Sequence, residues 1–481
     1  MRRVMAASLV AAGVLVAAGG YVAADVLDVA PGILTLDRPQ PSPTPTVSGS
    51  PAPVLLPSAP APSGDLLTKA TGDAPPPTGA GLAAALTTAS RDPDLAGGLG
   101  IVVADASTGE ELWALDGDRP RVPASTAKLL AALAVADTLD LDARMKTAVV
   151  AASGSRDLVL VARGDTLLAP GKSSPTAVLG RAGLDDLAAQ VAARLGPEAT
   201  RVRLRLDLSW APGPRFPTTW KPVDVLQPWG RPVVMTGLAT QLGEDHRAVP
   251  RFPEREVAKA FVARLADHGV TATLLPESTW ATPAPEDAVE LGAVESATYA
   301  EVLDHTLDVS DNPLIENLVR QAAATAGAPT VAPGADAAFI RARLEAHGVP
   351  TDGLVLKDAS GLSPGQAAAP RTIAAVLALA TTDEVPALRR LVAALPVSGL
   401  TGTLDDRFLS PSTRDVAGVP RAKTGTLDAG SGLAGTTVDA DGRLLGYVVL
   451  VDRFPRTYDG IVRARVALDR IVAALTRCGC R

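Results

Sequence analysis

A serine and a lysine, Ser125 and Lys128, stand three residues apart where a proline-led turn meets an alanine- and leucine-rich stretch with a helical pattern. Residues three apart on a helix project from the same face, so the lysine amine can take the proton of the serine hydroxyl. This arrangement supplies a nucleophile and its base. An isolated S-x-x-K is more often a helix cap beside a solvated lysine, so the rest of the chain must decide between the two interpretations.

A second motif, Ser310-Asp311-Asn312, stands between an expected helix over residues 298–309 and another that begins near Leu314. A structural interpretation makes Ser310 and Asp311 caps of the second helix. A functional interpretation makes Ser310 a proton relay near Lys128. The Asn312 amide, which both donates and accepts, would then hold a peptide group of a substrate.

A third motif lies in an expected edge strand that is followed by a hairpin over residues 433–450; it comprises Lys423, Thr424, Gly425 and Thr426. A lysine and hydroxyls beside a glycine can bind an anionic end of a substrate that approaches the backbone closely. The alternative is a solvated lysine that protects a sheet edge. S-x-x-K, S-D-N and K-T-G in this order are the motif set of class A β-lactamases and penicillin-binding proteins.

Further segments resemble the D-alanyl-D-alanine carboxypeptidase/endopeptidases known as class C low-molecular-mass penicillin-binding proteins. They are Asp358-Ala359-Ser360-Gly361-Leu362-Ser363, residues 395–404, residues 422–427 and the turn Gly164-Asp165-Thr166-Leu167. The resemblance covers about residues 82–476, although Ala359 replaces the family's glycine and Thr166 its proline. It implies an α+β fold of the serine β-lactamase/transpeptidase type. In that fold an antiparallel sheet is flanked by helices and accompanied by an all-helical lobe.

The resemblance also implies a division of labour. Ser125 attacks the carbonyl between two D-alanines and is acylated, while Lys128 takes its proton. The pKa of Lys128 must be lowered for this, and both burial and the second cation of Lys423 would promote that. Ser310 passes the proton to the leaving amine. The residues implied in substrate binding are Asn312, Thr424, Gly425 and Thr426, with Lys423 also receiving the terminal carboxylate, and the backbone N–H groups of Ser125 and Thr426 are implied as the oxyanion hole.

The expected partners are peptidoglycan stem peptides that end in D-Ala-D-Ala, with β-lactams as inhibitors that acylate Ser125. Two alternatives remain open. A serine β-lactamase uses the same motifs, although about 180 residues separate Lys128 from Ser310 here. A non-catalytic wall-binding or antibiotic-sensing protein would share the N-terminal segment but has no need of all four groups: Ser125, Lys128, Ser310 and Lys423.

The N-terminus predicts export. Arg2 and Arg3 precede an uncharged apolar run over residues 4–24, which is typical of a cleaved signal peptide or an uncleaved signal anchor. Either version places the chain outside the cytoplasm, with a membrane contact through this segment if it is uncleaved. Residues 25–81 are rich in Pro, Ser and Ala and predict a disordered tether.

Domain boundaries follow from the strands expected between the first two motifs. Residues 148–152, 157–161 and 201–208 read as strands, and residues 253–269 have helical spacing. We expect an inserted β-rich domain over residues 146–252. The catalytic domain would comprise residues 82–145 together with 253–481, so that the helix after residue 253 marks its return.

Composition excludes several other classes of protein. A net charge of −7 argues against a nucleic-acid partner, because such binders carry a basic face. The four histidines form no H-x-x-x-H or H-E-x-x-H spacing, so we expect neither a metal nor another cofactor. Cys478 and Cys480 are too close in sequence to link distant parts of the fold. We therefore expect an interchain disulfide or two inert thiols there.

Overall fold

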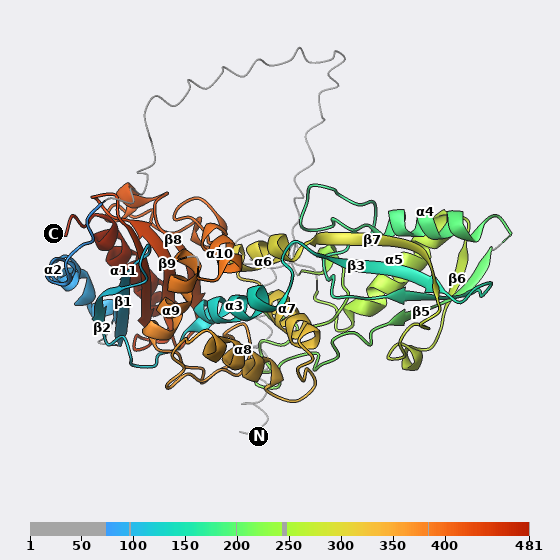
Figure 1. The fold of residues 1–481 in the computed structure, drawn as a ribbon, viewed down its shortest axis with the longest axis horizontal. Helices are drawn as coiled ribbons and strands as arrows, with labels where there is room; N and C mark the ends of the chain where they lie inside the picture. Colours follow the sequence, from blue (N-terminus) through green and yellow to red (C-terminus); the bar gives the residue numbers. More distant parts are fainter. Residues whose placement is uncertain (1–73, 96–97, 199, 243–247, 383, 481) are drawn as a thin grey trace, which may run out of the picture. The chain divides into compact units, whose positions relative to one another are not determined.

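The computed structural model describes residues 74–95, 98–198, 200–242, 248–382 and 384–480 (Figure 1). The expected export segment and most of the expected tether lie outside these residues. Within the described residues, the first helix is α2; it begins at Gly79, slightly before residue 82, where the catalytic domain was expected to start. Within the described ranges, no helix combines the length and apolar character needed to cross a membrane.

The first sheet joins strands from both ends of the described chain in the order β2-β1-β10-β9-β8, with every pair antiparallel. Its strands are β1 (Leu99–Asp105), β2 (Glu111–Leu115), β8 (Arg421–Thr426), β9 (Ser431–Val438) and β10 (Leu444–Val451). Helices α2 (Gly79–Ser90) and α11 (Tyr458–Thr476) share one core with this sheet, and α9 (Pro370–Thr381) belongs to the core on the other face. Because both faces of β10 are covered, its side chains are nearly all apolar.

A helical region packs beside this sheet. It contains α3 (Lys128–Thr138), α6 (Tyr299–Asp308), α7 (Asn312–Thr325), α8 (Ala335–Ala346) and α10 (Arg389–Ala393). Residues 129–135 of α3 are fully buried, and a helix that is apolar on every side is expected at the centre of a core. The helix therefore holds Lys128, its first residue, in the interior.

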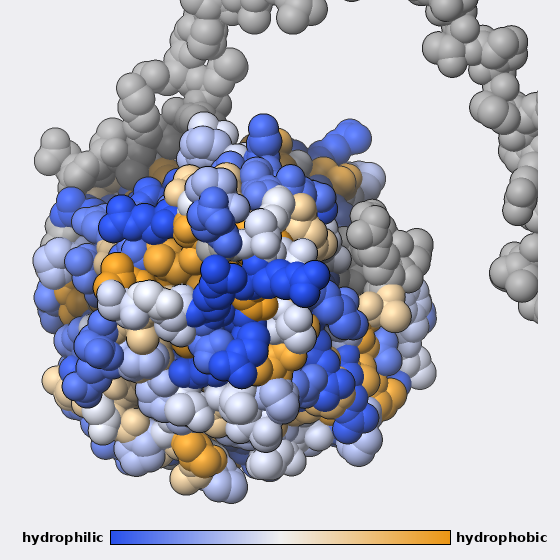
Figure 2. Space-filling view, turned by 90° about the vertical axis from the view of Figure 1, so that its right-hand side faces the viewer, coloured by the Kyte–Doolittle hydropathy of each residue, from blue (hydrophilic) through white to orange (hydrophobic). Residues whose placement is uncertain are grey.

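The second sheet has the order β6-β5-β4-β3-β7 and is mixed. Its strands are β3 (Arg144–Ala151), β4 (Asp157–Val161), β5 (Arg201–Asp207), β6 (Thr271–Leu274) and β7 (Val289–Thr298). Helices α4 (Leu184–Leu195) and α5 (Pro253–Asp267) share its core. We call residues 144–298 the second-sheet region; its end of the molecule presents mainly polar and charged side chains, with small apolar patches between them (Figure 2).

Two features differ from the sequence-based expectation for this region. The helix after residue 253 forms, but Val257, Phe261 and Leu265 pack it into the core of the second sheet. The chain therefore returns to the first fold only after β7, beyond the boundary expected at residue 252. Helical periodicity identifies an apolar face without saying which core will cover it. The expected β-rich range also contains α4, a helix that this description omits.

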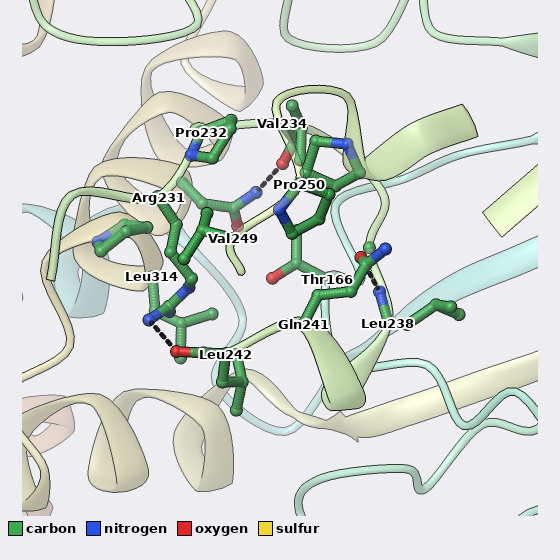
Figure 3. A pocket seen from close by; sticks show the side chains of 14 residues that line it. Thr166, Arg231, Pro232, Val234, Leu238, Gln241, Leu242, Val249, Pro250 and Leu314 are labelled. Carbon is green, nitrogen blue, oxygen red and sulfur yellow. Dashed lines mark hydrogen bonds between the residues drawn. The ribbon is translucent and has the colours of Figure 1, made fainter. Parts of the chain in front are cut away.

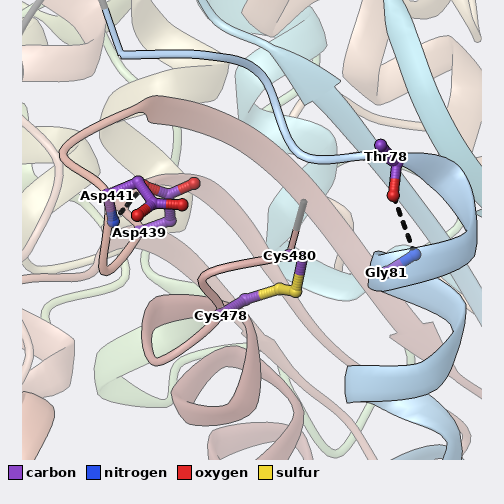
Figure 4. The surroundings of a disulfide bond; sticks show 6 residues. All are labelled: Thr78, Gly81, Asp439, Asp441, Cys478 and Cys480. Atoms are coloured by element: carbon purple, nitrogen blue, oxygen red, sulfur yellow. Dashed lines mark hydrogen bonds between the residues drawn. A yellow bond between two sulfur atoms is a disulfide. The ribbon is translucent and has the colours of Figure 1, made fainter.

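The expectation for the cysteines was wrong, because Cys478 and Cys480 form a disulfide with each other inside the chain. The described part of the chain contains no free cysteine. Figure 4 shows the disulfide beside the start of α2. There the Thr78 N–H donates to the Cys480 carbonyl at 2.7 Å, and the Thr78 hydroxyl caps the helix at Gly81. The C-terminal segment is thus held against α2.

Candidate active site

The first motif forms a strained turn at the entrance to α3. Ala124 has a φ of +46°, which is unusual for a residue other than glycine. A short 3-10 helix over Ala124–Ala127 follows and leads directly into α3. This turn places Lys128 Nζ 2.9 Å from Ser125 Oγ. Backbone strain of this kind gathers at functional sites, and here it presents a partly exposed serine beside a buried amine.

The amine of Lys128 has two further acceptors. Its Nζ lies 2.5 Å from Asn312 Oδ1 and 2.8 Å from the carbonyl oxygen of Ser360. When the amine is neutral, two N–H bonds to these acceptors leave its lone pair free to face Ser125. Complete burial lowers the pKa of Lys128 to about 8, while the carboxylates of three neighbours oppose that shift; they are Asp358, Glu316 and Asp311.

The second motif occupies the break between α6 and α7. Ser310 is partly exposed and has a φ of +60°. Asp311 caps α7 by accepting from the Leu314 N–H at 2.9 Å, and its other oxygen pairs with Arg231. The capping interpretation therefore holds for Asp311, whereas Asn312 reaches Lys128. The roles expected for Ser310 and Asn312 in the reaction stay predictions.

The third motif lies on β8, which is an edge strand as expected. Lys423 is fully buried and its Nζ donates to the carbonyl of Thr424 at 2.9 Å. A Cβ added to Gly425 would lie only 3.2 Å from the Ser125 nitrogen, so β8 runs against the Ser125 turn. Thr426, at the end of the strand, is exposed. The three motifs thus contribute to one site.

The electrostatic relation between the two lysines differs from the expectation. Burial, rather than the charge of Lys423, is what lowers the pKa of Lys128. The mutual repulsion is felt by Lys423, whose pKa burial and the Lys128 cation together hold well below its usual range.

Several residues next to the site gave no recognisable signal in the sequence. The Asn312 amide donates to the carbonyl of Trp229 at 3.0 Å, and Trp220 Nε1 donates to Asp358 at 3.0 Å. Lys221 pairs with Asp428 at 3.5 Å, just after β8. Trp220, Lys221 and Trp229 belong to the second-sheet region, which therefore forms one wall of the site. These residues lie in a loop, and a loop has no helical or strand periodicity in its sequence from which such contacts could be predicted.

A separate pocket lies beside α7 (Figure 3). Its lining includes Thr166, Arg231 and Gln241 from the second-sheet region together with Leu314 and Asn317 of α7. Ser125, Lys128 and Ser310 are absent from its lining, so this pocket is distinct from the site around Ser125. Among the described residues, no group of three or more His, Cys, Asp and Glu side chains is placed to hold a metal ion.

The fold and site define the class of protein. The chain belongs to the D-Ala-D-Ala carboxypeptidase 3 (S13) family, whose model matches residues 82–243 and 245–474. This confirms the family expected from the motifs and, with it, a D-Ala-D-Ala carboxypeptidase of the penicillin-binding class. The α+β fold expected from the resemblance is confirmed as well.

Particular relatives agree with this assignment. The chain is 35% identical to carboxypeptidase DacB of Mycolicibacterium smegmatis, over 85% of this chain and 86% of the relative. It is 29% identical to the D-alanyl-D-alanine carboxypeptidase of Actinomadura sp., over 75% and 79% of the two chains. Its fold is similar to that of penicillin binding protein 4 (dacB) from Haemophilus influenzae, with a TM-score of 0.63, 17% identity and coverage of 80% and 98%.

Proposed function

We propose that this chain is a serine-type carboxypeptidase that removes the terminal D-alanine of peptidoglycan stem peptides through an ester on Ser125. The observation that carries the proposal is the contact of Lys128 Nζ with Ser125 Oγ at 2.9 Å inside a three-motif site. The serine hydroxyl gives its proton to the neutral amine while Oγ attacks the penultimate carbonyl. The backbone N–H groups of Ser125 and Thr426 would hold the resulting oxyanion.

Collapse of this intermediate breaks the peptide bond. The leaving amine of D-alanine takes a proton that Lys128 holds and that Ser310 relays. Lys423, Thr424 and Thr426 would receive the terminal carboxylate, next to the close backbone approach at Gly425. The Asn312 amide would hold a substrate peptide group. Water then cleaves the ester and returns Ser125 to its starting state.

The base has to be neutral to act. Since burial lowers the pKa of Lys128 to about 8, the fraction of free amine at neutral pH is far larger than for an exposed lysine. The rate of acylation is therefore expected to rise with pH up to and through about pH 8, as the amine loses its proton.

Penicillin is the sharpest probe of this proposal, and a solved relative of the same fold is described as a complex with a β-lactam. Intact mass after penicillin treatment is expected to show one adduct on the wild type and none on Ser125→Ala. Release of D-alanine from a peptide ending in D-Ala-D-Ala should disappear in the same variant. An adduct that survives in Ser125→Ala would show that the nucleophile is elsewhere.

The same two assays on the purified protein distinguish the alternative functions. Fast hydrolysis of a chromogenic β-lactam, in place of a long-lived adduct, would support a β-lactamase. If the protein forms no penicillin adduct and also releases no D-alanine, it is a non-catalytic binder.

An extracytoplasmic location is part of the proposal, because the substrate lies in the cell wall. The support is the Arg2-Arg3 leader with its apolar run over residues 4–24, followed by the tether over residues 25–81. The mass of the mature chain in a membrane and a soluble fraction tests whether the leader is cleaved or serves as an anchor. Recovery of the unprocessed chain in the cytoplasm would contradict this location.

A further inference from the structure

Helix α7 carries a buried polar stripe that begins in the active site. Asn312, Glu316 and Arg320 recur every four residues and so lie along one face of the helix. All three are at most 7% exposed. Asn312 contacts Lys128, while Glu316, one turn further along, has no assigned part in the reaction.

The carboxylate of Glu316 grips a backbone segment. Its Oε1 accepts from the Ser360 N–H at 2.9 Å, and both oxygens lie 3.1 Å from the Ala359 nitrogen. Glu316 is completely buried. A buried carboxylate is costly unless donors compensate for the lost water, so these N–H groups and the charge hold each other in place.

The gripped segment is the one that holds the base. The carbonyl of Ser360 accepts from Lys128 Nζ at 2.8 Å. Asp358 fixes the rest of the segment by accepting from the N–H groups of Gly361 at 2.8 Å and Ser363 at 2.7 Å. A continuous set of contacts therefore runs from Glu316 through the backbone N–H and carbonyl of Ser360 to the amine.

We propose that Glu316 is a positioning residue for the acylation of Ser125. It fixes the Ser360 carbonyl that, together with Asn312 Oδ1, turns the lone pair of Lys128 toward Ser125. Its negative charge also sets how readily the amine gives up its proton. The proposal rests on the proposed function, and Glu316 acts through Lys128 without touching the substrate.

The charges around the pair determine the sign of the effect. Lys128 is faced by Asp358, Glu316 and Asp311, and its own cation acts on Lys423. Burial, with the charges of Asp358 and Asp336, raises the pKa of Glu316 to about 8, against the pull of its N–H donors.

On the other side of Glu316, its charge and that of Asp336 act on Arg320. The charge of Glu316 raises the pKa of Lys128 and so opposes the effect of burial. An anion at Glu316 retains the proton on Lys128, so its removal lowers the pH at which the free amine appears.

The test measures the acylation rate constant with a fluorescent penicillin from about pH 6 to pH 10. Glu316→Gln keeps the size of the side chain and removes the charge, and the rising limb of the profile is expected to move down by about one pH unit. Glu316→Asp keeps the charge but withdraws it by one methylene. Its limb should stay in place while the rate falls about tenfold.

Glu345→Gln, on the exposed face of α8, is the matched control and should reproduce the wild-type profile. A folded Glu316→Gln with an unmoved limb overturns the proposal, provided that the wild type is acylated on Ser125. Absence of that wild-type adduct would instead refute the proposed function. If Glu316→Gln does not fold, Glu316→Asp decides, and a wild-type rate in that variant overturns the proposal.

Discussion

Gly361 belongs to the segment that holds Lys128 and packs against the Ser125 turn, so its replacement by alanine is expected to damage both. Gly361 has a φ of +84°, and an added Cβ would lie 1.9 Å from the carbonyl oxygen of Ala124. The left-handed conformation costs an alanine about 1 kcal/mol, and forcing an extra methyl into a packed interior costs about 1–3 kcal/mol. We therefore expect Gly361→Ala to lose about 2–4 kcal/mol of unfolding free energy.

The loss of activity should exceed the loss of stability. The segment around Gly361 is fixed by Glu316 and Asp358, so much of the clash must be relieved by moving the Ser125 turn. A displacement of about 1 Å at a reacting group costs on the order of a hundredfold in rate. Urea unfolding and acylation by a fluorescent penicillin measure the two effects on the same preparation.

Gly348 provides the control. It has a φ of +67° after α8 with no atom within 4 Å of an added Cβ, so Gly348→Ala carries the strain without the clash. We expect this variant to lose about 1 kcal/mol and to acylate normally. Wild-type acylation by Gly361→Ala, or equal losses of stability in the two variants, would refute the reasoning.

Three further predictions concern other parts of the molecule. Burial raises the pKa of Asp165 to about 7, so the cost of ionising it is present above that pH and disappears as the pH falls toward its usual value. Asp165→Asn should therefore raise the Tm at pH 8 more than at pH 5, and equal shifts at both would contradict this. Asp469→Ala leaves the buried cation of Arg407 without its partner and should cost about 3 kcal/mol in urea unfolding; a change below about 1 kcal/mol would show that the pair is unimportant. Iodoacetamide should label Cys478 and Cys480 only after reduction, whereas labelling of the native monomer or a disulfide-linked dimer would disprove the internal bond.

The sequence singled out the side chains of the candidate site because the chemistry expected of them restricts residue type. Ser125, Lys128 and Lys423 are recognisable since few other residues supply a nucleophile, an amine base or a buried cation. The edge strand with Lys423 and the hairpin over residues 433–450 were also predicted, and they correspond to β8, β9 and β10. The carbonyl of Ser360 could not be recognised in the sequence, because every residue has a backbone oxygen whatever its side chain. The acceptor that orients the base was therefore invisible before the chain was folded.

The extent of the second-sheet region was predictable only in part. Strands β4 and β5 were expected close to their observed bounds, but β3 begins at Arg144, before the strand expected at residues 148–152. Helix α5 was assigned to the wrong core. The pairing of β3 with β7, which closes the region, joins residues more than 100 positions apart. Such a contact is set by tertiary packing and has no local pattern, so the boundary could not be read from periodicity.

The loop that carries Trp229 shows why this region matters to the reaction. An asparagine amide has a donor end and an acceptor end, and only one orientation of Asn312 offers Oδ1 to Lys128. The Trp229 carbonyl accepts from Asn312 Nδ2 at 3.0 Å and thereby fixes that orientation. Glu316 fixes the second acceptor of Lys128 from the other side, through Ser360. The amine is thus aimed at Ser125 by two acceptors, one held from the second-sheet region and one from α7, so a change in either support should alter the base before it alters the nucleophile.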